Sequence, residues 1–213
     1  MFNLEKKTNK KYSVFMKRCC FFITLCISIS LVLFSCVSSI GTIPPQETLS
    51  INRKIAAKGI KTPEQLATFF ISMNPKADYD QVNRLANYYV QEAEYEGINS
   101  DVAFVQMCLE TGFLRFGGLV TADMHNYCGL GAIDEQNPGE RFATEQLGVK
   151  AHIQHLHAYG TTTTLRGELI DRRYKYVNPR GKAPDIQGLA GTWAADPNYG
   201  NKLENLLQKL EEF

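Results

Sequence analysis

The stretch DVAFVQMCLETGFLRFG, Asp101–Gly117, joins an apolar helical pattern to a glycine-containing segment through a single carboxylate. Val102, Val105 and Leu109 recur at spacings that place them on one face of a helix. Glu110 falls in the last turn of that helix, and the Thr-Gly pair that follows ends it. A carboxylate in such apolar company costs desolvation free energy, so it is rare unless it has a use.

A carboxylic acid at the end of a buried helix is suited to donating a proton. Burial raises its pKa, and the negative pole at the C-terminal end of a helix acts in the same direction. Such a group keeps its proton near neutral pH and can deliver it to a leaving oxygen, as the general acid of glycoside hydrolysis does. The alternative is that Glu110 is a solvated residue at a helix end, which is common. Position alone leaves both interpretations open.

Helical patterns dominate the chain beyond its N-terminal part. Thr62 before Pro63 is an N-cap with proline at the first helical position, and Gly97 ends the next helix. The glycine-rich segment 113–142 predicts a loop with a short hairpin. We therefore expect a mainly α, single-domain fold with a glycine-rich segment beside a cleft. The predicted helices run from Pro63 to the residue before Asn74, from Tyr79 to Gly97, from the N-cap Ser100 to Glu110, from the N-cap Thr144 to Gly160, from the N-cap Asp185 to Trp193, and from Asp196 to the C-terminal end.

The first 35 residues have the composition of a secretory signal. Met16 is followed by a Lys-Arg pair and then by an apolar run, Cys19–Phe34. A basic region, an apolar region and a small residue follow one another in signal peptides, and this run of about sixteen residues is short for a membrane-spanning helix. The sequence LFSC resembles a lipobox with Cys36 as the lipidated residue, although its phenylalanine is bulkier than usual. A plain cleaved signal and an uncleaved anchor are the alternatives.

These features divide the chain into three parts. Residues 1–35 are the predicted lipoprotein-type signal peptide, and residues 36–60, which open with a stretch rich in Ser, Thr and Pro, are the predicted tether. Residues 61–213 form the predicted domain, which is long enough to bury one core.

The charge balance argues against a nucleic-acid partner. Residues 1–35 hold six of the 23 basic and one of the 22 acidic residues, so 17 basic and 21 acidic residues remain, a net charge of −4. No basic stripe survives in that body. Export together with a mildly acidic domain indicates a protein of the cell envelope, membrane-anchored if Cys36 is lipidated.

Two cysteines, Cys108 and Cys128, remain in the body once the signal segment is set aside. They are too few for a disulfide framework and have no metal-ligand spacing. Two buried free thiols are the favoured interpretation, and pairing in an oxidising compartment stays open.

Three segments in order carry a resemblance to a known family: ETGF at Glu110–Phe113, NYCGLG at Asn126–Gly131, and WAADPNYGNKL at Trp193–Leu203. Together they resemble the bacterial glucosaminidase domain, glycoside hydrolase family 73, found in autolysins and flagellar muramidase-like proteins. The third segment is the most specific, and the resemblance extends over about residues 61–213. It implies a lysozyme-like, mainly helical fold that cuts the β-1,4 bond after N-acetylglucosamine in peptidoglycan.

The resemblance also implies roles for individual residues. Glu110 matches the family's catalytic acid, Tyr199 its essential tyrosine, and Asn126 an asparagine that lines the cleft. An amide and a phenol can hydrogen-bond a sugar N-acetyl group, and Trp193 or Tyr127 could stack on a pyranose face. For Trp193, a place in the core is the favoured alternative.

The sequence departs from the family pattern in two places, at Cys128 and at the acid that some members use as a base. Cys128 stands where phenylalanine is usual, which changes packing rather than chemistry. Some members use a second carboxylate as base, and the predicted hairpin lobe offers Asp134, Glu135 and Glu140. We favour Glu140 slightly as the candidate base, and an inverting pair would need carboxyl groups about 6.5–9.5 Å apart. Otherwise the substrate's own N-acetyl oxygen acts as nucleophile.

The histidines His152, His155 and His157 do not predict a metal site. The first two are helical neighbours, the third points elsewhere, and no carboxylate or cysteine completes a zinc-type set. We therefore expect a monomeric enzyme that uses neither a metal nor a cofactor.

The sequence thus predicts an exported, lipid-anchored endo-β-N-acetylglucosaminidase with Glu110 as general acid, acting on peptidoglycan or on another glycan containing N-acetylglucosamine. The alternatives are a lytic transglycosylase or muramidase on the same fold, an endoglycosidase of N-linked glycans, and a non-catalytic glycan-binding envelope protein.

Overall fold

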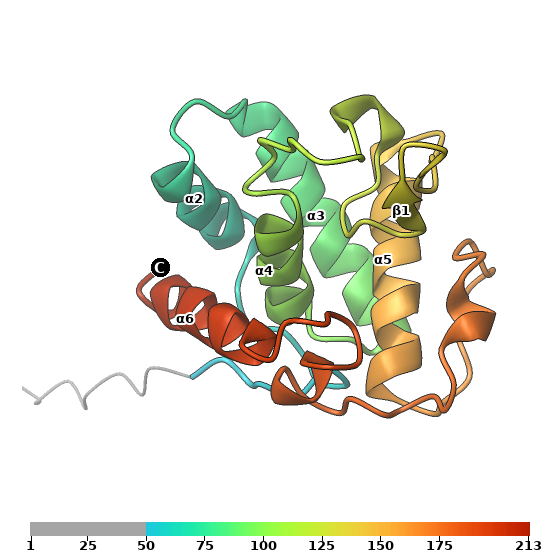
Figure 1. Ribbon diagram of the computed structural model, residues 1–213. Helices are drawn as coiled ribbons and strands as arrows, with labels where there is room; N and C mark the ends of the chain where they lie inside the picture. The colour runs from blue at the N-terminus through green and yellow to red at the C-terminus, as the bar shows by residue number, and fades with distance from the viewer. Residues whose placement is uncertain (1–49) are drawn as a thin grey trace, which may run out of the picture. The chain divides into compact units, whose positions relative to one another are not determined.

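The computed structural model describes residues 50–213, and the predicted signal peptide and Cys36 lie outside this range. The described chain is mainly helical, which confirms the predicted fold class (Figure 1). The glycine-rich segment contains the predicted hairpin, whose two short strands pair antiparallel. The elements are α2 (Pro63–Met73), α3 (Tyr79–Glu96), α4 (Ser100–Glu110), β1 (Ala132–Asp134), β2 (Asn137–Pro138), α5 (Glu145–Gly160) and α6 (Tyr199–Glu211), with 3₁₀ turns at Ala122–Met124, Tyr174–Tyr176 and Gln187–Leu189.

Helix α4 is the central element of the domain. It lies among α2, α3, α5 and α6 (Figure 1) and packs against all four. Every residue from Ser100 to Cys108 is buried. A helix that is buried all round has no polar face, so only its last turn can reach solvent. Its C-terminal end, at Glu110, is therefore the place where the core meets the surface.

The predicted helix limits agree with the structure wherever a strong cap is present. Thr62 forms a capping box with Gln65 at the start of α2, and Gly97 ends α3 with a φ of 74°. At the start of α4 the prediction was wrong by one residue. Asn99, not Ser100, is the N-cap, because its side chain accepts hydrogen bonds from the N–H groups of Asp101 and Val102.

The predicted helix from Asp185 to Trp193 is shorter than expected. Asp185 accepts hydrogen bonds from the N–H groups of Gln187 and Gly188, as a cap does, but the helical part is only the 3₁₀ turn Gln187–Leu189. Gly191 adopts a φ of 73° and reverses the chain. The reversal brings Trp193 back toward the end of α4.

The folded domain begins earlier than predicted, so the second half of the predicted tether is wrong. Ile51 and Ile55 are buried in the core, and the N–H of Ile55 donates to the carbonyl of Pro184. The guanidinium of Arg53 binds Glu204 and Glu211 on α6. Residues 50–60, here called the strap, form no helix and no strand that pairs within a sheet, so their sequence has no periodicity that would predict their place. In the part of the chain from 50 onward, no helix has the length and apolar composition needed to cross a bilayer.

Gly148 allows α5 to approach the loop before the hairpin, and Gly148→Ala is expected to lower the free energy of unfolding by about 1–3 kcal/mol. A Cβ at this position would overlap the carbonyl oxygen of His125, which is backbone and cannot rotate away. Urea denaturation would measure the loss. Gly118→Ala is the matched control, because a Cβ there meets no atom within 4 Å. Equal stabilities of the two variants would contradict the close packing at α5.

Candidate active site

Glu110 is the last residue of α4, and two aromatic side chains donate hydrogen bonds to one of its oxygens. The hydroxyl of Tyr199, the first residue of α6, donates to Oε1 at 2.5 Å. The indole Nε1–H of Trp193 donates to the same oxygen at 2.9 Å. Two segments far apart in the sequence, the end of α4 and the stretch from Trp193 to Tyr199, thus meet at one carboxyl group.

The carboxyl group of Glu110 lies at the edge of a cleft of about 220 Å³. One side of the residue is open to this cleft, whereas protein atoms surround the rest of the carboxyl group. Burial raises the pKa of Glu110, and the hydrogen bonds from Tyr199 and Trp193 oppose this rise without cancelling it. The cleft is lined mostly by the segment after α4 and by the loop before the hairpin, including Gly112, Phe116, Val120, Asn126, Gly129 and Ala132.

The chain after Glu110 forms the cleft wall in an uncommon backbone conformation. Phe113, Leu114 and Phe116 have φ values of 57°, 57° and 53°, in the left-handed region that non-glycine residues rarely adopt. Three hydrogen bonds hold this run: Thr111 accepts one at its hydroxyl from the N–H of Leu114 and one at its carbonyl from the N–H of Phe116, and the N–H of Phe113 donates to the carbonyl of Cys108. Such strain persists where the surroundings determine the shape.

Asn126 lies in the cleft wall, and its amide group is engaged with the backbone. Its Nδ2 donates to the carbonyls of Leu130 and Glu140, and its Oδ1 accepts from the N–H of Leu130. The side chain is 1% exposed. Asn126 therefore ties the two ends of the hairpin lobe together beside the cleft.

The two aromatic residues predicted to stack on a sugar have different surroundings. Tyr127 is buried in the core against Gly148, so the expectation that it stacks on a pyranose is wrong: neither ring face is open. Trp193 is partly buried and packs against the rings of His155 and Tyr159, each at 5.2 Å between centroids. The ring of Trp193 thus packs against the edge of the core, while its N–H reaches Glu110.

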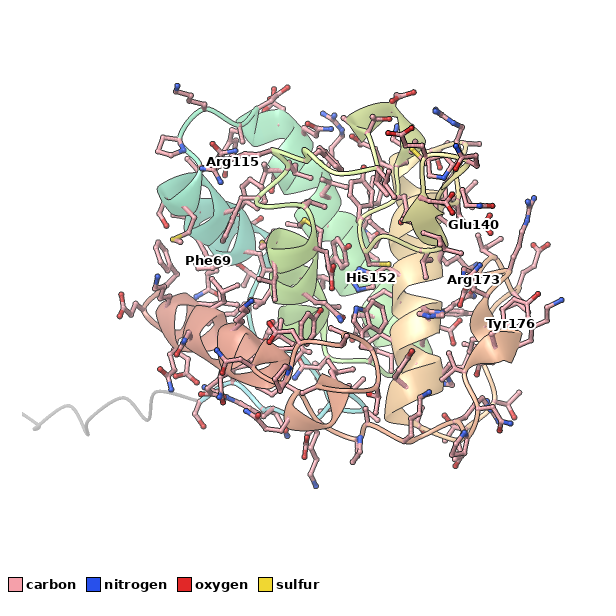
Figure 2. The ribbon with its side chains drawn as sticks, in the orientation of Figure 1. Phe69, Arg115, Glu140, His152, Arg173 and Tyr176 are labelled. Atoms are coloured by element: carbon pink, nitrogen blue, oxygen red, sulfur yellow. The ribbon has the colours of Figure 1, made fainter. Side chains whose placement is uncertain are left out.

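None of the three hairpin acids lines the cleft of Glu110 in the described structure. Glu140 lines neighbouring hollows with Arg141 and Arg172, and its carboxylate lies 4.0 Å from Nη1 of Arg172. Figure 2 shows Glu140 near Arg173, to the outside of α5. The carboxylate of Asp134 accepts hydrogen bonds within the hairpin turn, and Glu135 is exposed there. The backbone N–H of Glu140 donates to the carbonyl of Leu130, and the residue borders those hollows and not the cleft of Glu110.

Two residues that the sequence analysis did not assign to the site, Gln106 and His152, lie directly behind it. Nε2 of Gln106 donates to the hydroxyl of Tyr199 at 3.0 Å, and Oε1 of Gln106 lies 3.1 Å from Nε2 of His152. The other ring nitrogen of His152 lies 2.8 Å from the hydroxyl of Tyr89. Gln106 precedes Glu110 by four residues, one helical turn, and this spacing was the signal available in the sequence.

The histidines and cysteines have separate environments. His155 binds the carboxylate of Asp171, and His157 lies against Tyr174 and Thr163, so the three histidines do not converge. Among residues 50–213, no three His, Cys, Asp or Glu side chains could hold a metal ion together. Both described cysteines, at positions 108 and 128, are free and buried, which confirms the favoured interpretation.

The chain is similar to known proteins in two respects. Residues 86–212 match the family model Glucosaminidase, described as mannosyl-glycoprotein endo-beta-N-acetylglucosaminidase. The chain is also 38% identical over 159 residues to an uncharacterized protein of Borreliella burgdorferi, an alignment that covers 75% of this chain and 78% of that protein. The family match includes Glu110, Asn126, Trp193 and Tyr199.

Proposed function

Since this chain belongs to the glucosaminidase family, we propose that it is an endo-β-N-acetylglucosaminidase that hydrolyses β-1,4 bonds in the glycan strands of peptidoglycan. Family membership indicates a glycan hydrolase, and the particular bond and substrate are the proposal. The observation that carries it is the carboxyl group of Glu110, which lies at a cleft with two donors on Oε1.

The proposed general acid is Glu110. The described residues make no hydrogen bond to its Oε2, so this oxygen is the one that a glycosidic oxygen in the cleft would meet. Proton transfer from Oε2 to the leaving oxygen accompanies cleavage of the bond to the anomeric carbon. Tyr199 and Trp193 then stabilise the carboxylate that forms, because both already donate to it.

We propose that the substrate's own N-acetyl oxygen attacks the anomeric carbon. This proposal is supported by the position of the hairpin acids, none of which lines the cleft with Glu110. The attack forms a cyclic oxazolinium ion as the glycosidic bond breaks. The Glu110 carboxylate then takes a proton from the water that opens the ring, which restores the acid and retains the anomeric configuration.

Export and membrane anchoring through Cys36 are also proposed, on the basis of the N-terminal sequence alone. A lipid on this residue would hold the enzyme at the membrane beside its substrate. Labelled palmitate should enter the full chain in cells, and the Cys36→Ser variant should remain unlabelled. Equal labelling of both would remove the anchor from the proposal.

The function is tested by digesting purified peptidoglycan with the protein, reducing the fragments with borohydride and analysing them by mass spectrometry. New reduced N-acetylglucosamine ends, absent with Glu110→Gln, are expected. Reduced or anhydro-muramic ends would instead identify a muramidase or transglycosylase. If no ends form, the same assay on N-linked glycans and a pull-down on peptidoglycan decide between the endoglycosidase and the non-catalytic binder.

The rate of cleavage should depend on the ionisation of Glu110. Because the acid acts only when protonated and burial raises its pKa in the free enzyme, kcat/KM is expected to be high below that raised pKa and to fall about tenfold per pH unit above it. Initial rates from pH 4 to pH 9 would measure this limb. A rate that is flat to pH 9 would contradict the role of Glu110.

A further inference from the structure

Behind Glu110, a chain of hydrogen bonds runs through the core and joins four helices. It passes from Tyr89 on α3 to His152 on α5, then to Gln106 on α4 and Tyr199 on α6. Figure 2 shows His152 between α4 and α5. The first three side chains are 0% exposed and Tyr199 is 5% exposed, so water does not complete their hydrogen bonding. Each polar atom in the chain therefore depends on the next for its partner.

The amide of Gln106 gives this chain a direction. Its NH₂ group can only donate, and it faces the oxygen of Tyr199. The single hydroxyl hydrogen of Tyr199 is then left for Oε1 of Glu110, where the bond is observed. At the active site, the hydrogen-bond chain thus ends in the hydroxyl of Tyr199 as a donor to Glu110, whether or not Glu110 is protonated.

The other end of the amide determines the state of His152. The carbonyl of Gln106 can only accept, so Nε2 of His152 carries the hydrogen. Burial, with a smaller contribution from His155, lowers the pKa of His152 to about 3, so the ring is neutral at physiological pH. Nδ1 is therefore an acceptor, and the hydroxyl of Tyr89 donates to it. In this tautomer Nε2–H can bind only the carbonyl end of Gln106, so the orientation of the amide and the tautomer of His152 maintain each other.

We propose that Gln106, locked by His152, is a positioning residue that directs the hydroxyl of Tyr199 at Oε1 of Glu110 and so confines the acid's proton to Oε2, the oxygen to which no described residue is hydrogen-bonded. The inference rests on the proposed role of Glu110. Tyr199 and Trp193 both donate a hydrogen to Oε1. A proton on that oxygen would therefore lie against these two hydrogens. Reversal of the amide would have the opposite effect. Tyr199 would then donate to Gln106, and the proton of Glu110 would move to Oε1 and point at the phenol instead of at the substrate.

The kinetic test compares Gln106→Met with the wild-type enzyme. The methionine fills a similar volume without hydrogen bonds, and kcat is expected to fall about 10- to 100-fold with KM nearly unchanged, because the substrate does not touch this residue. Gln154→Met is the matched control. Gln154 is also 0% exposed and fully hydrogen-bonded, but to the backbone of residues 168–171. An unchanged kcat for Gln106→Met, or an equal fall for both variants, would overturn the inference.

A second variant distinguishes the direction of the hydrogen bonds made at position 106 from the packing of the side chain there. In Gln106→Glu the introduced carboxyl group can donate to Tyr199 and accept from His152 only while it is protonated. The ratio of its kcat to that of Gln106→Met is therefore expected to rise as the pH is lowered. At low pH the kcat of Gln106→Glu should approach that of the wild-type enzyme. A ratio that stays constant with pH would show that position 106 contributes only packing, and would overturn the inference. If Gln106→Met does not fold, the kcat of Gln106→Glu is compared with that of the wild type instead; the ratio is expected to rise as the pH is lowered, and a constant ratio would overturn the inference.

The tautomer of His152 tests the inference without any turnover. ¹⁵N NMR of the wild-type full chain, assigned with His152→Asn, should show a neutral ring with hydrogen on Nε2. A hydrogen on Nδ1 would mean that every hydrogen bond in the series runs in the opposite direction. That result would overturn the inference even in an active enzyme. Failure of the proposed function is distinguishable, because it would appear as wild-type protein that forms no reducing ends.

Discussion

Glu110→Gln is expected to lower kcat on peptidoglycan by about 10²- to 10⁴-fold, the range that general acid catalysis contributes. The glutamine keeps an oxygen that can accept from Tyr199 and Trp193, so the geometry of the site should survive. It has no ionisable proton, so the leaving oxygen would depart as an alkoxide. Initial rates of reducing-end release would measure the loss, with little change in KM.

The fold of Glu110→Gln should remain intact. Because burial raises the pKa of Glu110, ionisation in the folded state is unfavourable, and the wild type loses stability as the pH rises through that raised pKa. The neutral amide avoids this loss, so thermal melting of the variant at pH 8 should be equal or higher. Glu94→Gln, on the exposed face of α3, is the control. A Glu110→Gln enzyme that turns over at the wild-type rate would refute the assignment.

The second large effect expected is a loss of folding stability in mild acid, caused by His152. The pKa of this residue is about 3 in the folded protein because of burial, against an ordinary value of 6.5. The unfolded chain therefore binds a proton below pH 6.5 that the folded chain does not bind until about pH 3. The free energy of unfolding is expected to fall by up to ~1.4 kcal/mol for each pH unit in this window, on account of this one residue.

Urea denaturation at intervals from pH 7 to pH 4 would measure this contribution. His152→Asn keeps a polar side chain that does not titrate, so its stability, although lower at pH 7, should fall less steeply with pH. The slopes of the free energy of unfolding against pH should differ between wild type and variant by the amount that corresponds to about one bound proton. Parallel curves for wild type and variant would show that His152 is protonated in the folded state, which also conflicts with the direction of the buried chain.

The helices could be predicted from the sequence because their limits depend on local chemistry. Thr62 and Gly97 act through the backbone within a few residues, and the structure confirms both limits. The strap could not be predicted, because an extended segment without periodicity acquires its place only from α6 and the loop that it meets.

The candidate site was predictable where a motif is contiguous, and less so where the fold determines orientation. Glu110 meets Trp193 and Tyr199, as the first and third of the sequence segments suggest. Tyr127 follows Asn126 directly, yet only Asn126 lines the cleft, whereas Tyr127 is buried in the core. The chain through Gln106 depends on the relative rotation of four helices, which no local pattern encodes.

The left-handed run after Glu110 affects how this protein can be improved by directed evolution. Each non-glycine residue held there costs about 1–2 kcal/mol relative to a relaxed backbone. A screen for heat resistance should therefore select glycine at Leu114, where the side chain is only partly buried. A screen for turnover should discard the same change, since a more flexible wall would hold the sugar less firmly beside the acid. Selection for lifetime and selection for rate would thus favour different residues at one position four residues from Glu110.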